Sequence, residues 1–221
     1  MKRILIIGGT SKLGGELIKK FIANKNYIYF TYYRNIKKAK LIESNYNKKN
    51  LEVCKKIKIN LKDKNQIKKI KYLIQKNNFD IILNNAANIP TKKKFTKISI
   101  KKLKECFEIN FFSYFYLLQQ ILNIKGLNNN LIIINITSNV VKTGGKFLTH
   151  YSTSKSALST LTKALSREFK KIKFLNISFP KIYYNCKSNK DGINYIKIIN
   201  KINFIIKNRK KINSGSTIFI K

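Results

Sequence analysis

The segment Tyr151-Ser152-Thr153-Ser154-Lys155 holds the side chains with the clearest potential for chemistry. In a helix, this i, i+4 spacing places Tyr151 and Lys155 on one face, one turn apart. A free tyrosine has a pKa of about 10, which is too high for efficient proton exchange at neutral pH, and a nearby ammonium group lowers it. The pair therefore indicates a proton-transferring tyrosine. An ordinary amphipathic helix would also explain the spacing, because the chain contains 12 tyrosines and many lysines.

A second candidate, Ser138, follows an apolar run that predicts a strand at Leu131–Thr137. Polar residues just beyond the carboxyl end of a parallel strand lie where doubly wound folds bind their ligands. We therefore expect Ser138 to donate a hydrogen bond to a substrate carbonyl oxygen. The alternative is a serine that only caps a loop.

A glycine-rich turn, Gly8-Gly9-Thr10-Ser11-Lys12-Leu13-Gly14-Gly15, follows the first predicted strand and leads into a helix. Glycines allow the backbone to turn tightly and to approach a pyrophosphate, which the helix N-terminus then binds through free N–H groups. The segment predicts nucleotide binding, although any tight strand-to-helix connection can use glycine.

The elements that must position these residues alternate along the chain. Short apolar runs predict strands, and longer periodic stretches between them predict helices. Repeated β-α units indicate an α/β fold, a single doubly wound Rossmann-type domain with a seven-stranded parallel sheet. We expect one domain over residues 1–221, with a short substrate lid near 181–214. The predicted strands are Arg3–Ile7, Tyr27–Tyr32, Lys56–Asn60, Asp80–Leu83, Leu131–Thr137, Phe174–Ser178 and Thr217–Ile220, and the helices lie near 13–24, 36–45, 63–77, 98–124, 151–170 and 193–208.

Composition limits the class of protein. The chain has 221 residues and 43% hydrophobic residues, enough for a sizeable core. Its net charge of +38 is compatible with a polyanion-binding surface, but only four of the 47 basic residues are arginines and lysine is spread over nearly every polar stretch. We interpret this charge mainly as compositional drift, so nucleic-acid binding is not expected. The three cysteines, Cys54, Cys106 and Cys186, have no disulfide or metal-ligand pattern, and no apolar run is long enough for a membrane span. These features predict a cytoplasmic protein without a metal.

Taken in order, the motifs resemble those of the short-chain dehydrogenase/reductase family, and the resemblance covers nearly the whole chain. The family's T-G-x-x-x-G-x-G turn corresponds to Ile7–Gly14, and its Asn-Asn-Ala-Gly motif to Asn84–Ala87. The N-x-x-x-P-G motif appears as Asn176 to Pro180, and the segment from Ser214 to Phe219 is similar to the usual last strand. The four catalytic positions of the family correspond to Asn110, Ser138, Tyr151 and Lys155.

The resemblance implies a role for each of these four residues. Tyr151 would give a proton to the carbonyl oxygen, and Lys155 would hold the nicotinamide ribose and lower the pKa of Tyr151. Ser138 would orient the substrate oxygen, and Asn110 would support a water relay. The cofactor-binding residues implied here are Gly8, Thr10, Ser11, Lys12, Leu13, Gly14, Arg34, Asn60, Asn85, Ala86, Tyr151, Lys155, Pro180 and Asn185.

Several of these positions depart from the family pattern. Lys12 replaces the middle glycine of the turn, and a lysine tolerates positive φ poorly, so this backbone must stay in an ordinary region. Ala87 and Lys181 each replace a glycine. Asn60 stands where an aspartate usually contacts adenine, and Asn185 where a threonine often contacts the nicotinamide amide. The four catalytic positions match the family pattern, whereas the departures affect the lid geometry and the substrate affinity that the resemblance implies.

Cofactor choice depends on the residues after the strand Tyr27–Tyr32. No acidic residue is present there to bind the ribose hydroxyls, as NAD requires. Arg34 could contact a 2′-phosphate with help from Lys12, so we expect NADP(H) rather than NAD(H). Alternatively, Arg34 is only one more basic surface residue.

The resemblance further implies interconversion of a carbonyl and an alcohol, and a homo-oligomer such as a tetramer. Members similar to 3-oxoacyl-acyl-carrier-protein reductases act in fatty acid biosynthesis, which would make acyl carrier protein a partner. Small ketones, sugars and pterins are other candidate substrates. A non-catalytic nucleotide- or RNA-binding module with the same fold is the alternative from a different functional class.

Overall fold

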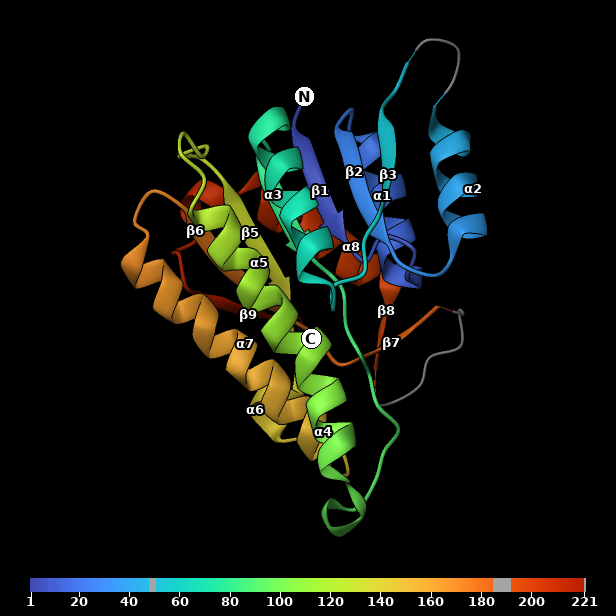
Figure 1. Cartoon of the computed structure of the whole chain (residues 1–221), viewed down its shortest axis with the longest axis vertical. Coiled ribbons are helices and arrows are strands. Elements are labelled where there is room, and N and C mark those ends of the chain that lie inside the picture. The colour runs from blue at the N-terminus through green and yellow to red at the C-terminus, as the bar shows by residue number, and fades with distance from the viewer. Residues whose placement is uncertain (48–50, 185–191, 221) are drawn as a thin grey trace. The chain divides into compact units, whose positions relative to one another are not determined.

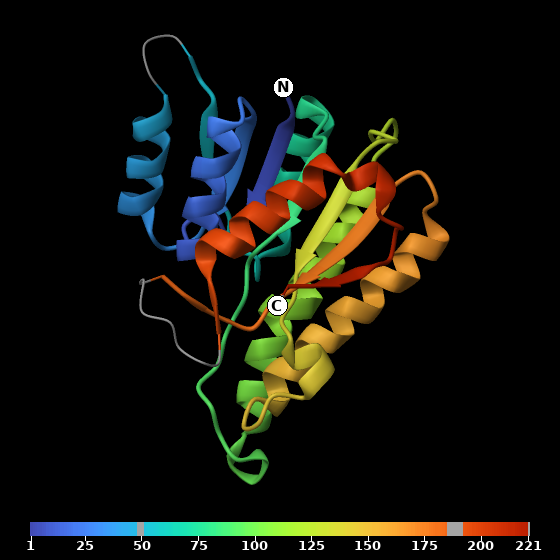
Figure 2. The same ribbon diagram turned by 180° about the vertical axis from the view of Figure 1, so that it is seen from behind.

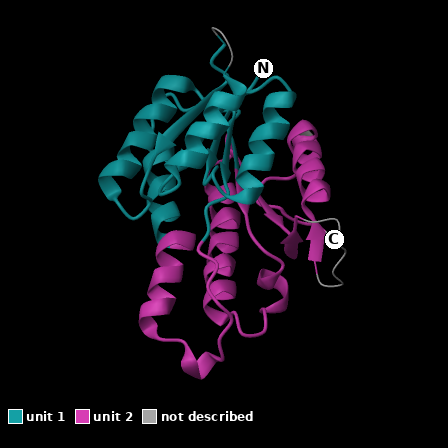
Figure 3. Ribbon diagram, turned by 90° about the vertical axis from the view of Figure 1, so that its right-hand side faces the viewer, with its two compact units in different colours: residues 1–87, 112–133 teal, residues 88–111, 134–221 magenta. Residues whose placement is uncertain are grey.

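The computed structural model describes residues 1–47, 51–184 and 192–220 (Figure 1). The chain falls into two compact units, each assembled from two stretches of sequence (Figure 3). Unit 1 comprises residues 1–87 and 112–133, and unit 2 comprises residues 88–111 and 134–221. The predicted organisation as one domain remains a prediction.

The main sheet has seven strands in the order β3-β2-β1-β4-β5-β6-β9, which confirms the expected doubly wound α/β sheet. Strand β1 pairs in parallel with both β2 and β4, so the strand order reverses beside β1, where this class of fold binds its ligands. The predicted strand at 56–60 is shifted, since it begins at Cys54 and ends at Lys58. The seven strands are β1 (Arg3–Ile7), β2 (Tyr27–Tyr32), β3 (Cys54–Lys58), β4 (Ile81–Asn84), β5 (Ile132–Ile136), β6 (Lys173–Ser178) and β9 (Thr217–Phe219).

Unit 1 contains β1 to β4 with helices α1, α2, α3 and α5. The central strand β1 is apolar because both faces of the sheet are covered there, and Ile4 to Ile7 are each 0% exposed. The edge strand β3 differs, since three of its five residues are lysines. Polar side chains begin the first three helices, since Ser11, Asn35 and Asp63 each accept hydrogen bonds from free backbone N–H groups of the first turn. The helices are α1 (Lys12–Ala23), α2 (Ile36–Tyr46), α3 (Lys64–Asn77) and α5 (Ser113–Leu122).

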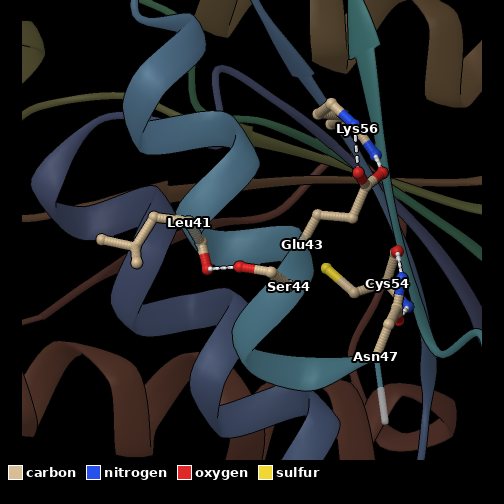
Figure 4. A network of polar contacts seen from close by, with 6 residues as sticks. All are labelled: Leu41, Glu43, Ser44, Asn47, Cys54 and Lys56. Atoms are coloured by element: carbon tan, nitrogen blue, oxygen red, sulfur yellow. Dashed lines mark hydrogen bonds and ion pairs between the residues drawn. The ribbon is translucent and has the colours of Figure 1, made fainter. Parts of the chain in front are cut away.

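A polar network fastens the edge strand β3 to α2 (Figure 4). The Glu43 carboxylate forms an ion pair with Lys56 and accepts a hydrogen bond from the Lys56 backbone N–H at 2.9 Å. The Asn47 amide accepts from Cys54 N at 2.9 Å and donates to Cys54 O at 2.7 Å. Burial raises the pKa of the Cys54 thiol to about 12, so this thiol stays neutral. The network is structural, because it satisfies backbone groups of a strand at the edge of the sheet.

Unit 2 contains helices α4, α6, α7 and α8 with strands β6 and β9. Its helices α7 (orange) and α8 (red-orange) can be followed in Figure 2. Two short strands, β7 and β8, pair in parallel as a separate sheet that sequence analysis did not predict. They have three residues each, too few for a recognisable alternation of polar and apolar residues. The expected lid region contains these strands and α8. The elements are α4 (Ile100–Phe107), α6 (Val140–Thr143), α7 (Thr149–Glu168), β7 (Lys181–Tyr183), β8 (Gly192–Asn194), α8 (Tyr195–Lys207) and the 3-10 turns Phe95–Lys97 and Arg209–Lys211.

The single helix predicted at 98–124 is wrong, because a π-helical turn at Glu108–Phe112 separates α4 from α5. A π turn accommodates one additional residue and changes the helix face on which later side chains lie. Such turns occur frequently at functional sites. Asn110, one of the predicted catalytic residues, lies within this turn.

The tight packing of the glycine turn leads to a first prediction, because Gly14 and Gly15 are adjacent but differ in surroundings. A Cβ atom on Gly14 would lie 2.6 Å from Gly8 O, a backbone atom that cannot move independently, whereas one on Gly15 would meet nothing within 4 Å. Gly14→Ala is expected to reduce the free energy of unfolding by about 1–3 kcal/mol through overpacking. Gly15→Ala should instead add about 0.5–1 kcal/mol, because glycine is unfavourable inside a helix. Urea denaturation measures both, and equal effects of the two substitutions would contradict the described packing.

Candidate active site

The four predicted catalytic residues all lie in unit 2. Asn110 is in the π turn, Ser138 lies two residues after the end of β5, and Tyr151 and Lys155 are one turn apart near the start of α7. Asn110, Tyr151 and Lys155 are buried, and Ser138 is half-buried. The structure therefore brings together, on neighbouring elements of one unit, residues that are far apart in sequence.

The hydroxyl of Tyr151 is hydrogen-bonded to the Ser138 side chain. Burial raises the pKa of Tyr151 to about 12, and this hydrogen bond opposes part of the rise. Desolvation has the larger effect on the pKa of Tyr151 in this arrangement, and the expectation that Lys155 lowers this pKa stays a prediction. A tyrosine with a raised pKa is fully protonated at neutral pH, which is the state required of a proton donor.

Lys155 is 2% exposed, and its ammonium group donates a hydrogen bond to Ile136 O at 3.0 Å. Burial lowers the pKa of Lys155 to about 8, because removing an ammonium from water disfavours its charged form. The hydrogen bond joins the catalytic helix to the last residue of β5, two residues before Ser138. Lys155 is therefore both a candidate for binding a polar ligand and a contact that positions α7.

The Asn110 side chain is held by four contacts. Its oxygen accepts from Asn88 N at 2.7 Å, and its amide nitrogen is 3.0 Å from Asn88 O, 3.0 Å from Ser154 Oγ and 3.2 Å from Cys106 Sγ. The Ser154 hydroxyl in turn donates to Tyr151 O at 2.8 Å. Asn88, Cys106 and Ser154 were not predicted as parts of this cluster, because their contacts depend on the π turn. Of these three residues, only Ser154 could have been noticed in the sequence, because it lies between Tyr151 and Lys155.

Unit 1 contains the predicted phosphate-binding turn, and the backbone there is tightly constrained. Gly8 has a φ of +83°, and a Cβ on it would lie 3.0 Å from the backbone of Ala86. The Asn85 amide donates to Gly8 O at 2.9 Å and to Ser11 Oγ at 2.8 Å. Asn85 and Ala86 therefore shape the turn from the end of β4.

The departure at Lys12 has a structural explanation, because Lys12 is the first residue of α1 and needs no positive φ. The first turn of α1 contains no acidic side chain, and both Ser11 and Lys12 are exposed at its N-terminus. A helix N-terminus with exposed N–H groups and a lysine favours a phosphate anion. Leu13 is buried and faces the core of unit 1, so any contribution from it comes through its backbone. The residues present thus fit the phosphates of a dinucleotide.

The remaining predicted cofactor residues differ in what the structure shows. Arg34 is exposed, and its guanidinium lies over the Tyr33 ring at 5.2 Å from the ring centroid. Asn60 is half-buried, and its side-chain oxygen accepts from Lys62 N at 3.1 Å. Pro180 is half-buried after β6, and Asn185 lies outside the described residues.

Neither a metal centre nor a membrane span is found in the part of the chain that the structure describes. No group of three or more His, Cys, Asp or Glu side chains there could hold a metal ion. None of the helices formed by these residues is long and apolar enough to cross a bilayer.

Known structures share this fold over nearly their whole length. A protein provisionally named 3-oxoacyl-reductase from Bacillus thuringiensis superimposes with a TM-score of 0.86, 19% identity, and coverage of 100% of this chain and 96% of its own. A blue fluorescent protein from a metagenomic library, in complex with NADPH, gives a TM-score of 0.86 at 18% identity, with coverage of 100% and 96%. At these identities the likeness establishes the fold alone.

Sequence comparison adds a relative and a family. The uncharacterized oxidoreductase YhxC of Bacillus subtilis (strain 168) is 38% identical over 88 residues, which is 40% of this chain and 30% of that protein. The match thus spans less than a third of the length of this curated relative. The family model for short chain dehydrogenases matches residues 2–182, a range that includes the glycine turn and all four predicted catalytic residues. The chain therefore belongs to the short chain dehydrogenase family.

Proposed function

We propose that the protein is an NADP(H)-dependent oxidoreductase that interconverts a carbonyl and an alcohol. The observation that carries this proposal is the hydrogen-bonded pair Ser138–Tyr151 with Lys155 one helical turn away. A pair of hydroxyl groups on neighbouring elements can hold a carbonyl oxygen between them, and one of the two can transfer a proton to it. In a family of oxidoreductases, this arrangement is best suited to the interconversion of a carbonyl and an alcohol.

In the reductive direction, Ser138 donates a hydrogen bond that orients the substrate oxygen. A nicotinamide, when bound, would supply a hydride to the carbonyl carbon. Tyr151 gives its proton to the oxygen, which yields the alcohol and a tyrosinate that is reprotonated from solvent. Lys155 would bind the nicotinamide ribose, and its charge would favour the tyrosinate formed in this step. Asn110 would support the path by which the proton is replaced, with its own side chain held by Asn88 and Ser154.

A screen of NADPH oxidation at 340 nm against acyl, sugar and aromatic ketones tests this proposal. Turnover of at least one carbonyl class is expected. Absence of turnover with the whole panel, together with tight and salt-dependent RNA binding, would instead support a binding module with the same fold.

The substrate class that we favour is a 3-oxoacyl group on acyl carrier protein, as in fatty acid biosynthesis. The support for this choice is the naming of structural neighbours as 3-oxoacyl and betaketoacyl-ACP reductases. An excess of lysine would also suit an acidic carrier protein, although the lysines are too widespread to locate a docking surface. Comparison of 3-oxoacyl groups on carrier protein and on pantetheine would show whether the carrier itself is recognised.

Cofactor preference gives the second prediction. Wild-type enzyme is expected to use NADPH in preference to NADH, and Arg34→Asp should narrow or reverse the preference by replacing the cation with a carboxylate. The measurement is kcat/KM for both cofactors. Lys19→Asp, an equal charge change at an exposed position of α1, is the matched control and should leave the ratio unchanged. An NADH-preferring wild-type enzyme would refute this proposal.

The third prediction concerns assembly, for which we propose a homo-oligomer, a tetramer by family resemblance. The segment 98–124 carries Phe107, Phe111, Phe112, Phe115 and Tyr116, and of these Phe112 and Phe115 are 51% and 39% exposed. These rings would be buried against another copy of the chain.

The net charge makes this assembly dependent on salt. Because the chain carries +38, electrostatic self-repulsion opposes association, and salt screens this repulsion with a Debye length of about 8 Å at physiological ionic strength. Assembly should therefore strengthen as salt rises. Light scattering across a salt series measures this, and a monomer at micromolar concentration throughout would contradict it.

A further inference from the structure

The buried side of the catalytic helix α7 is unusual because it is almost entirely polar. Leu158 is the only aliphatic residue among the fully buried ones, and Leu161 and Leu165 are half-buried, so hydrophobic packing alone gives a limited preference for one register of the helix over another. Hydrogen bonds are directional and can supply that preference. The buried residues of α7 are His150, Tyr151, Ser152, Ser154, Lys155, Leu158, Ser159 and Thr162.

A polar network in unit 2 connects this side of α7 to two strands. The Asn135 amide of β5 donates to Thr162 Oγ1 at 2.8 Å, and Thr162 Oγ1 lies 2.7 Å from the Asn176 side-chain oxygen in β6. All three residues are 0% exposed. The Asn176 amide also contacts Ser159 Oγ and Thr217 Oγ1, both at 3.2 Å, which extends the network to β9. A single hydroxyl on α7 is thus fixed between side chains of two adjacent strands.

The network is costly in one respect, since the Asn135 side-chain oxygen is buried without a hydrogen-bond partner. An unpaired buried acceptor destabilises the fold. An aliphatic residue at position 135 would avoid this cost, as Ile134 and Ile136 do on either side. The amide at this position therefore points to a role for its donor, which contacts Thr162.

The position of Thr162 relates this network to the reaction. Tyr151, Lys155 and Thr162 follow one another at helical intervals along the same buried stripe of α7. Ser138 follows β5 three residues after Asn135. A displacement of α7 by one residue would move it about 1.5 Å and rotate it by about 100°, which would separate Tyr151 from Ser138.

We propose that Thr162, held between Asn135 and Asn176, is a positioning residue that sets the register of α7 against β5 and β6 and thereby aligns Tyr151 with Ser138. The inference rests on the proposed roles of Tyr151 and Ser138 in catalysis. Thr162 contacts neither of them and acts through the helix. The hydroxyl of Thr162 is required for this positioning, whereas its methyl group is not.

Three substitutions test the proposal by kinetics. Thr162→Val keeps the shape and removes the hydroxyl, and it is expected to reduce kcat by about tenfold or more with little change in KM, because small misplacements of reacting groups have effects up to about 10²-fold. Thr162→Ser restores the hydroxyl and should recover most of the wild-type kcat. Thr160→Val makes the same replacement at an exposed position of α7 and should behave as wild type.

Amide hydrogen exchange of α7 provides a second measurement of helix positioning, and it needs no substrate. Residues 149–168 should exchange faster in Thr162→Val than in either Thr162→Ser or Thr160→Val. Wild-type kcat in Thr162→Val, or an equal loss in Thr162→Ser, would overturn the proposal. If the wild-type protein shows no turnover, that result contradicts only the proposed function. In that case, an unchanged rate of amide hydrogen exchange in Thr162→Val would overturn the proposal that Thr162 sets the register of α7.

Discussion

Tyr151→Phe is expected to lower kcat by about 10²- to 10⁴-fold, the usual contribution of a general acid, while cofactor affinity stays nearly unchanged. Phenylalanine keeps the ring that fills this buried position and removes only the hydroxyl bonded to Ser138. The hydride donor and the fold are unaffected, so the loss falls on the proton-transfer step. Steady-state turnover and a fluorescence titration with NADPH measure the two quantities separately.

A matched control for this prediction is Tyr114→Phe, which removes another buried tyrosine hydroxyl from a position outside the proposed site. Tyr114 is 2% exposed, lies in unit 1, and its hydroxyl has no hydrogen-bond partner. Removal of an unpaired buried hydroxyl should leave kcat unchanged and should not destabilise the protein. Turnover of Tyr151→Phe within a few-fold of wild type would exclude Tyr151 as the acid.

The second large effect is expected from Lys155→Met, which should abolish turnover but stabilise the cofactor-free protein at pH 7. Burial lowers the pKa of Lys155 from 10.5 to about 8. The charged ammonium therefore destabilises the folded state at pH 7. At about 1.4 kcal/mol for each unit of pKa, the largest gain available is about 3 kcal/mol. Loss of the hydrogen bond to Ile136 O offsets about 1 kcal/mol of this gain.

The sign of the pH dependence makes this prediction specific. Because the folded-state pKa is below the unfolded value, the unfolded chain binds more protons between pH 8 and pH 10.5, and wild-type stability rises with pH across this range. The advantage of Lys155→Met should therefore be complete below pH 8 and vanish near pH 10.5. Urea denaturation of both proteins from pH 7 to pH 10 measures the difference. A constant or growing difference would show that desolvation of Lys155 is not its cause.

The sequence predicted the main sheet well because its strands are short apolar runs bounded by polar turns. Ile4 to Ile7 and Ile132 to Ile136 are examples whose burial on both faces leaves no alternation to misinterpret. The break at Glu108–Phe112 was not predictable in this way, because a π turn changes backbone hydrogen bonding without a change in residue type. Strands β7 and β8 escaped prediction because their pairing depends on tertiary contacts.

Spacing and position in the sequence indicated Ser138, Tyr151 and Lys155, and the family resemblance added Asn110. The structure places all four in one unit, and their catalytic roles stay predictions. Their environment was not predictable. Spacing indicated that Lys155 lies beside Tyr151, but only burial determines that the pKa of Tyr151 is raised. The contacts of Asn110 with Asn88 and Ser154 likewise depend on the π turn and on the packing of α7.

The burial of Lys155 also bears on how the sequence acquired its composition. Among the residues whose burial is described, Lys155 is the only buried lysine, and no arginine, aspartate or glutamate is buried with it. The mutational bias toward lysine codons that we infer from the composition would therefore be tolerated at solvent-facing positions and opposed in the core, where burial of an unpaired charge destabilises the fold. Under this interpretation, the residue types at exposed positions reflect mutational bias, and those at buried positions reflect selection for a stable fold. This one buried lysine lies where we propose that the chemistry requires an ammonium group.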